Sequence, residues 1–207
     1  MGIGVFGGSF DPVHMGHLRL AEEVRETFSL ERVYFVPARI QPLKQPARGA
    51  KAEDRVRMLK MALRGNTFFR TSTIEIKRGG ISYSIDTVRQ FRLRFNEIYF
   101  LVGADAFSDI GMWRDFEELF RSTNFIVMVR PGRRFEGLPE ALRGQVGRVD
   151  DSTWEHASGR KIHFHHMTQL DISSTRIREL SKKGRSIKYL VPSSVERYII
   201  ARGLYRH

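Results

Sequence analysis

The chain of 207 residues is 41% hydrophobic and 11% aromatic, which is enough apolar material for the core of one domain. It contains no cysteine, no apolar run of the roughly 18 residues that a membrane span needs, and no signal-peptide pattern at its start. Disulfides, thiol nucleophiles and zinc fingers are thereby excluded, and we expect a cytoplasmic protein that does not bind membrane. A formal net charge of +12 favours anionic ligands without choosing between nucleotides, RNA and acidic surfaces.

Short apolar runs alternate with segments of helical periodicity along the chain. The runs that predict strands are Ile3–Phe6, Val33–Val36, Thr73–Ile76, Ile98–Val102, Phe125–Val129 and Ile162–Phe164. The segments that predict amphipathic helices have apolar faces at Leu18 to Phe28, Val56 to Leu63, Val88 to Phe95 and Trp113 to Phe120. This alternation predicts an α/β fold with a doubly wound, mainly parallel sheet and helices on both faces.

Two regions depart from the alternation. Residues 131–160 show weak periodicity and several glycines, which predicts a surface excursion with a short helix around Pro139–Leu142. The C-terminal end, about 171–207, is helical and basic, and its cations are either a solvated face or a contact for RNA. Since no repeat or low-complexity tract marks a linker, we expect a single domain over 1–207.

The stretch GGSFDPVHMGH, residues 7–17, is the first candidate for chemistry. Gly7 and Gly8 end the first predicted strand, where an open parallel sheet binds ligands and where glycine lets a phosphate approach a helix start. A G-x-G-x-x-G match at residues 2–7 lacks the preceding strand that dinucleotide binding requires, so we interpret it as the strand itself. His14 and His17 can donate hydrogen bonds to phosphate, although an isolated pair of this kind more often caps a helix or packs beneath it.

A second candidate is ISSTRIR, residues 172–178, where hydroxyls and guanidinium groups open a late predicted helix. Such residues can cap the helix, through Ser173 or Ser174, and can equally hold a pyrophosphate. The two stretches resemble the (H/T)-x-G-H and I-S-S-T-x-I-R signatures of the nucleotidyltransferase superfamily. The resemblance implies a Rossmann-like fold and catalysis by His14, His17, Lys44 and Arg178. It also implies that ATP is bound by Gly7, Gly8, Ser9, Phe10, Gly103, Asp105, Ile172, Ser173, Ser174 and Thr175.

Motifs in the middle of the chain indicate which molecule accepts the transferred nucleotidyl group. Residues 81–87, ISYSIDT, resemble the S-Y-T-x-x-T segment of bacterial nicotinate-mononucleotide adenylyltransferases, and Gly103-Ala104-Asp105 with Trp113 resembles their G-x-D and tryptophan. This resemblance implies transfer of the adenylyl group of ATP to nicotinate mononucleotide, with Mg²⁺ accompanying ATP. It implies that the mononucleotide is bound by Ser84, Thr87, Asp105, Trp113 and Arg130. From spacing alone, Trp113 could be a core residue and Asp105 a helix cap.

Three positions depart from the family pattern. The chain has Gln41-Pro42-Leu43-Lys44 where the family usually has P-P-H-K, so an imidazole is lost and the cation is kept. Arg39 replaces a common asparagine, and Arg114 replaces the tyrosine that often follows the tryptophan. These replacements put the details of the pyridine pocket in doubt more than the ATP site.

Other functions remain open from the sequence. The acceptor could be nicotinamide mononucleotide or phosphopantetheine, and a protein of another class, either RNA-binding or a non-catalytic nucleotide sensor, could use the same charge. We expect ATP and nicotinate mononucleotide as partners, no nucleic acid, and either a monomer or a homo-oligomer. His163 and His165 alternate with Phe164 and could share one strand face, but no nearby carboxylate or cysteine completes a metal-ligand set.

Overall fold

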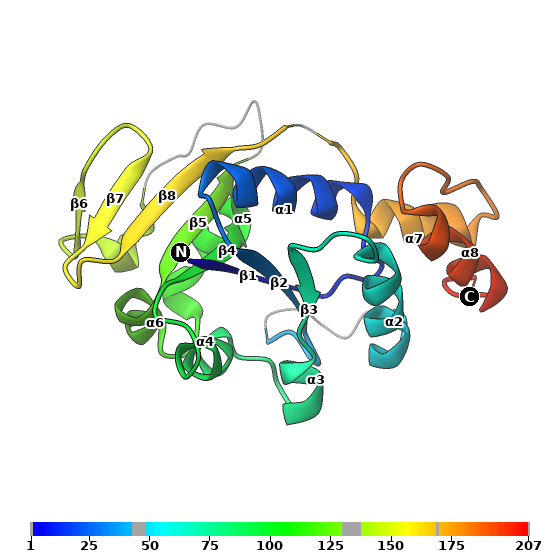
Figure 1. The fold of residues 1–207 in the computed structure, drawn as a ribbon, viewed down its shortest axis with the longest axis horizontal. Helices are drawn as coiled ribbons and strands as arrows, with labels where there is room; N and C mark the ends of the chain where they lie inside the picture. The colour runs from blue at the N-terminus through cyan, green and yellow to red at the C-terminus, as the bar shows by residue number, and fades with distance from the viewer. Residues whose placement is uncertain (1, 43–48, 130–137, 169, 207) are drawn as a thin grey trace.

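The computed structural model describes residues 2–42, 49–129, 138–168 and 170–206. Within these ranges eight strands form one sheet in the order β3-β2-β1-β4-β5-β8-β7-β6 (Figure 1). The strands are β1 (Ile3–Gly8), β2 (Arg32–Pro37), β3 (Phe69–Thr71), β4 (Ile98–Gly103), β5 (Asn124–Val129), β6 (Val146–Arg148), β7 (Thr153–His156) and β8 (Lys161–His166). The neighbours from β3 to β8 are parallel, whereas β7 and β6 add an antiparallel edge.

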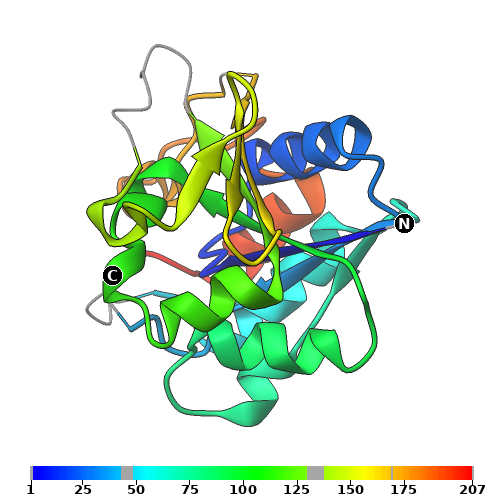
Figure 2. The same cartoon turned by 90° about the vertical axis from the view of Figure 1, so that its left-hand side faces the viewer.

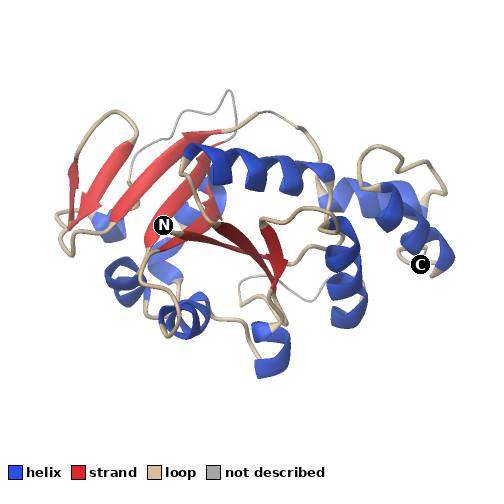
Figure 3. Cartoon of the chain, viewed as in Figure 1, coloured by secondary structure: helices blue, strands red, loops and turns tan. Residues whose placement is uncertain are grey.

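Helices cover both faces of this sheet (Figure 3). The described α-helices are α1 (Met15–Thr27), α2 (Ala52–Ala62), α3 (Ile74–Arg78), α4 (Ser84–Arg92), α5 (Ala104–Ser108), α6 (Phe116–Ser122), α7 (Ser174–Lys182) and α8 (Ser193–Ala201), with 3-10 turns η1 (Ile110–Met112) and η2 (Glu140–Leu142). Figure 2 shows α1, in blue, and the green helices α4 and α6 on opposite sides of the sheet. The predicted doubly wound, Rossmann-like α/β fold is therefore confirmed.

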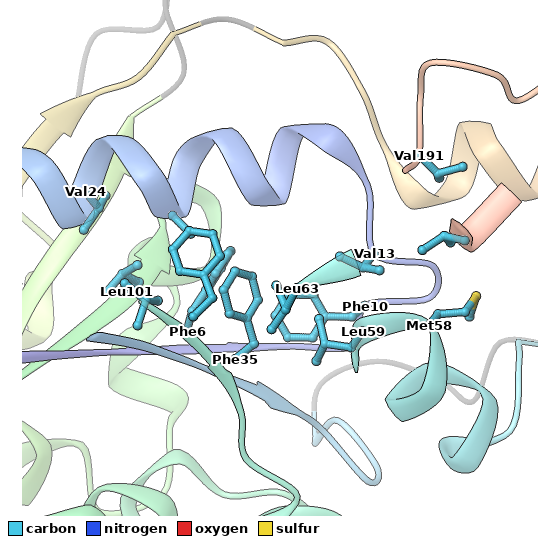
Figure 4. Close-up of a cluster of buried hydrophobic side chains, with 14 of the residues drawn as sticks. Phe6, Phe10, Val13, Val24, Phe35, Met58, Leu59, Leu63, Leu101 and Val191 are labelled. Atoms are coloured by element: carbon cyan, nitrogen blue, oxygen red, sulfur yellow. The ribbon is translucent and has the colours of Figure 1, made fainter. Parts of the chain in front are cut away.

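The two faces of the sheet contribute to two separate hydrophobic clusters, because side chains alternate along each parallel strand. Phe6 belongs to the cluster under α1, α2, α7 and α8, whereas Val5 belongs to the cluster under α4, α5 and α6. Figure 4 shows the first cluster continuing from Phe6 through Phe10 and Val13 to Val191 of the C-terminal region. The turn after β1 is thus anchored in this hydrophobic cluster by its own buried side chains.

The order of the strands creates a switch point between β1 and β4. The chain crosses from β1 to β2 on one side and returns to β4 on the other side of β1, so the connections leave the sheet in opposite directions. Ligands of open α/β sheets bind outside the carboxyl ends of the strands at such a point. The pairing of Phe6 with Leu101 brings the following residues, up to Gly8 and Gly103, to this edge together.

One predicted strand is wrong. Thr73–Ile76, rich in β-branched residues, begins helix α3 instead, and the strand that pairs with β2 is the shorter β3. Helical hydrogen bonds from Lys77 N–H to the Thr73 carbonyl and from Gly79 N–H to the Glu75 carbonyl define this helix. Tertiary contacts of the buried Glu75 override the local β propensity here.

Two further differences concern the edges of the fold. Residues 131–160 contain the predicted short helix, as η2, but also the hairpin β6–β7, which the glycines of this region conceal in the sequence. Trp113 does not continue helix α6, which begins at Phe116; its backbone is extended and it ends η1. The predicted helical C-terminal end consists of two helices, α7 and α8, and α7 lies beyond the end toward which β1 runs (Figure 1).

Candidate active site

The turn that follows β1 is held by a buried arginine. Arg55 of α2 donates from Nη1 to the Ser9 carbonyl at 2.7 Å and from Nη2 to the Ala38 carbonyl at 2.7 Å. It thereby ties the end of β1 to the end of β2, and its burial lowers the pKa of the guanidinium. Phe10 in this turn is buried and has a φ of 47°, a conformation that side chains rarely adopt. Sequence reasoning missed Arg55, because its position on an amphipathic helix resembles a solvated charge.

His14 and His17 lie face to face at the start of α1, with ring centroids 3.6 Å apart. The backbone N–H of His14 donates to His17 Nδ1 at 3.2 Å, so the neutral His17 ring carries its proton on Nε2. His14 Nδ1 is buried and has no hydrogen-bond partner among the described residues. A β-carbon at Gly16 would lie 3.1 Å from this nitrogen, so the absence of a side chain at Gly16 leaves room for the His14 ring.

Burial keeps both imidazoles neutral. It lowers the pKa of His14 to about 4, and it lowers the pKa of His17 well below its usual value, with repulsion from His14 as a second cause. At neutral pH the pair therefore offers N–H donors without a fixed positive charge. The hydrogen bonds of such donors can strengthen as negative charge develops on phosphate oxygens during a reaction.

The late motif meets the turn directly. Ser174 Oγ donates to the Pro12 carbonyl at 2.9 Å, and Arg178 Nη1 donates to the Asp11 carbonyl at 2.8 Å. The Met15 N–H at the start of α1 donates to the Leu190 carbonyl at 2.9 Å. The two motifs, about 160 residues apart in the chain, thus form one site, as the sequence predicted.

The remaining residues of the late motif have local partners. Ser173 caps α7 by accepting a hydrogen bond from the Arg176 N–H at 3.2 Å, and Thr175 Oγ1 accepts one from Arg178 Nη2 at 3.2 Å. Ile172 is half-buried and packs on the cluster beneath α1. The predicted cap is confirmed, and the predicted phosphate contacts of these residues stay a prediction.

Two glycines at the switch point have room around them. A β-carbon on Gly7 would approach nothing nearer than Phe100 at 3.7 Å, and one on Gly103 would meet no atom within 4 Å. Packing among the described residues therefore does not explain these glycines, whereas a ligand lying close to the backbone would. Asp105 is exposed in the first turn of α5, next to Gly103.

The segments predicted to bind the mononucleotide lie beside each other. The Arg114 guanidinium lies over the Tyr83 ring, with Cζ 4.8 Å from the centroid, so the residues around Trp113 meet the start of α4 at Ser84. Trp113 is half-buried and contacts Phe100 edge-on at a centroid distance of 6.1 Å. Trp113 is therefore partly exposed, on the face of β4 that carries Phe100.

Thr87 has a buried partner of its own. Its hydroxyl donates to Glu75 Oε1 at 2.6 Å, and only 1% of the residue is exposed. Arg78 Nη2 lies 3.4 Å from the same hydroxyl and 3.5 Å from the Tyr83 carbonyl, and burial raises the pKa of Glu75. This network fixes the segment before Ser84, and sequence reasoning missed Glu75 because it was placed in a strand. A direct contact of Thr87 with mononucleotide stays a prediction.

Two predicted site residues, Lys44 and Arg130, lie outside the described residues, as does Leu43. The described part of the chain contains no cluster of three His, Asp or Glu side chains that could hold a metal ion. His163 and His165 do share one strand face, where both rings contact Phe28. Among the described residues, no helix is long and apolar enough to cross a membrane.

Comparisons with known proteins identify the family to which the chain belongs. Residues 5–180 match the cytidylyltransferase-like family, and the chain belongs to this family of nucleotidyltransferases. Proteins named probable nicotinate-nucleotide adenylyltransferase from Pelobacter propionicus and Geobacter sulfurreducens are 44% and 42% identical to it. The alignments cover 99% of this chain and 98% of the first relative, and 100% of this chain and 99% of the second. Within its family the chain belongs to the nicotinate-nucleotide adenylyltransferases.

A solved structure supports the same fold. Plasmodium falciparum nicotinic acid mononucleotide adenylyltransferase complexed with NaAD is 21% identical in sequence, with a TM-score of 0.75. The match covers 99% of this chain and 97% of that chain. The arrangement of strands and helices is therefore shared over the full length.

The buried histidines make the stability of the protein depend on pH. The pKa of His14 rises from about 4 in the folded state to its ordinary 6.5 on unfolding, so the unfolded chain binds more protons between these values and stability falls as the pH falls. We expect His14 alone to cost about 2 kcal/mol of unfolding free energy between pH 7 and pH 5. Urea denaturation at both pH values measures this loss. The variant His14→Asn should lose less over the same interval, and an equal loss in both proteins would contradict the assignment.

Replacement of Thr87 measures how much its bond to Glu75 stabilises the fold. Thr87→Val removes the donor to the buried Glu75 at nearly constant volume, and we expect unfolding free energy to fall by about 1–3 kcal/mol. Thr87→Ser keeps the hydroxyl and should retain most of the stability. Thermal and urea denaturation of the two variants decide between these outcomes, and equal stability of valine and serine variants would show that the bond to Glu75 carries little weight.

Proposed function

We propose that the chain transfers the adenylyl group of ATP to nicotinate mononucleotide, giving nicotinate adenine dinucleotide and pyrophosphate, as a step of NAD biosynthesis. The observation that carries this proposal is the meeting of two phosphate motifs at one turn, through the bonds from Ser174 to Pro12 and from Arg178 to Asp11. The acceptor, nicotinate mononucleotide, is inferred from the names of the full-length relatives. The turn lies at the switch point, where this fold class binds nucleotides.

The reaction needs little from the protein beyond positioning and charge stabilisation. The 5′-phosphate of the mononucleotide is already a nucleophile, so it attacks the α-phosphorus of ATP in line and pyrophosphate leaves without a general base. His17 offers its Nε2–H, while Arg178 and Lys44 offer cations to the triphosphate. Gly7, Gly8, Ser9 and Phe10 of the turn, and the residues from Ile172 to Thr175, are the proposed ATP contacts.

Magnesium enters this scheme with ATP. The side chains described at the turn are mainly N–H donors and hydroxyls, which suit phosphate oxygens better than a bare cation. We therefore propose MgATP as the substrate form, held by phosphate oxygens and water. When bound, the ion neutralises charge on the triphosphate.

The acceptor is proposed to lie beyond β4. Trp113 offers an aromatic face that suits an electron-poor pyridinium ring, and Ser84, Asp105, Thr87 and Arg130 are the proposed polar contacts. Gly103 leaves room for backbone contact at the same edge, and it shares this edge with the ATP site. We also propose a cytoplasmic location, supported by the absence of cysteine, with the enzyme acting as a monomer or homo-oligomer without nucleic acid.

A pyrophosphate-release assay tests the function. With ATP and Mg²⁺ present, we expect nicotinate mononucleotide to give turnover well above that with nicotinamide mononucleotide or phosphopantetheine. Preference for either of those acceptors would redirect the proposal to another adenylyltransferase. Salt-sensitive polynucleotide binding with no pyrophosphate release would favour the RNA-binding alternative, and ATP binding without release would favour a nucleotide sensor.

Removal of one histidine tests the stabilisation of charge. His17→Ala deletes an N–H donor aimed at phosphate, and we expect kcat to fall roughly 10²- to 10³-fold. His165→Ala, on the face of β8 that contacts Phe28, is the matched control and should retain wild-type kcat. Melting temperatures show that both variants fold. Wild-type turnover in His17→Ala would refute the role of this ring.

A further inference from the structure

The end of the chain reaches back to the turn that carries the histidines. Tyr205, two residues before the C-terminus, donates its hydroxyl proton to Asp11 Oδ1 at 2.6 Å. Asp11 is buried and directly precedes the Pro12 carbonyl to which Ser174 donates. Residues 194 positions apart are thereby joined within the phosphate site.

Asp11 is the point at which four segments meet. Its Oδ1 also accepts the Ala50 N–H at 3.0 Å, and its backbone carbonyl accepts Arg178 Nη1 at 2.8 Å. Ala50 belongs to the segment just before α2, while Arg178 belongs to the late phosphate motif. A β-carbon on Gly49 would lie 2.0 Å from Asp11 Oδ2, so this segment passes directly over the carboxylate.

The direction of the Asp11 carboxylate matters because it is an anion within a site proposed for anions. Like charges a few ångströms apart repel, and this repulsion is strongest where water is excluded. The hydroxyl of Tyr205 and the Ala50 N–H satisfy Oδ1 and hold the carboxylate turned toward the chain end. Without the hydroxyl, Oδ1 would keep only the bond from the Ala50 N–H, and the carboxylate would be held less firmly in this direction.

Tyr205 keeps the proton that it donates to Asp11. Burial and the charge of Asp11 raise the pKa of the phenol, although the nearby Arg178 and Arg55 oppose this shift, so the hydroxyl keeps its proton throughout the working range. The residue also has a φ of 66°, in the left-handed region that side chains rarely adopt.

From this geometry we propose that Tyr205 is a positioning residue for adenylyl transfer. It turns the Asp11 carboxylate away from the triphosphate and holds the histidine turn, the Ala50 backbone and Arg178 around one nucleotide. This inference rests on the proposed function. It assigns a part of the catalytic arrangement to the end of the chain, which neither phosphate motif includes.

A second tyrosine provides a matched control. Tyr198 of α8 donates to Asp54 Oδ1 at 2.6 Å, so it makes a bond of the same type and length to a buried aspartate. Asp54 lies on α2 and makes no bond to the histidine turn in the described structure. A purely structural role for these C-terminal tyrosines predicts the same effect of both substitutions.

The experiment compares Tyr205→Phe with Tyr198→Phe by steady-state kinetics and thermal denaturation. We expect Tyr205→Phe to lower kcat about 10- to 100-fold and to raise the KM for ATP more than the KM for the mononucleotide. Tyr198→Phe should keep the wild-type kcat while its melting temperature falls by a similar amount. Equal kinetic effects of both variants, or wild-type kcat in Tyr205→Phe, would overturn the proposal.

A double-mutant cycle tests the mechanism through Asp11. In Asp11→Asn the side chain keeps an acceptor oxygen but loses the charge, so adding Tyr205→Phe should lower kcat less than it does in the wild type. Full additivity of the two effects would show that Tyr205 does not act through the Asp11 charge. If the wild-type enzyme releases no pyrophosphate with any acceptor, the proposed function fails and this inference falls with it.

Discussion

The site depends on two backbone carbonyls in the turn after β1. Pro12 and Asp11 present their carbonyl oxygens to Ser174 and Arg178, side chains that come from the far end of the chain. A bond from a guanidinium to a carbonyl is stronger than a bond between neutral groups, and both bonds fix direction as well as distance. Helices α1 and α7 therefore open toward the same point. The buried Phe10 and Val13 hold this turn from below, so the polar contacts act on a backbone that has little freedom to move.

Burial of the histidine pair changes the electrostatics of this site. Burial lowers the pKa of both rings and removes a positive charge that would attract ATP in the ground state. Neutral donors in fixed positions, however, interact most strongly when charge develops in the transition state, and such selectivity is what raises kcat. Steady attraction for the triphosphate is left to cationic side chains such as Arg178. The arrangement thus divides binding and catalysis between different kinds of side chain.

The sequence predicts those parts of the molecule that are local. Apolar periodicity predicts β1, β2, β4, β5 and β8, because buried parallel strands need continuous apolar runs. It fails at Thr73–Ile76, since the partner of Glu75 is a threonine twelve residues further along the chain, and no local pattern encodes that bond. It also fails for the hairpin β6–β7, whose strands are short and of which β6 carries Gly147. Contiguous motifs predict that His14 and Arg178 belong together, whereas Arg55 and Tyr205 act through contacts that exist only after folding.

The topology explains why the two halves of the site come from different layers. The turn after β1 enters α1 on one face of the sheet, with α2 and α7 beside it, whereas the chain after β4 enters α5 and α6 on the opposite face. In the proposed function, a ligand that spans the switch point meets the histidine turn at one end and Trp113 at the other. Because β1 and β4 are hydrogen-bonded neighbours, the sheet fixes the distance between the two strand ends from which these segments start. A reaction that joins two nucleotides by in-line attack requires such a fixed separation, since its rate depends on how closely attacking oxygen and phosphorus are aligned.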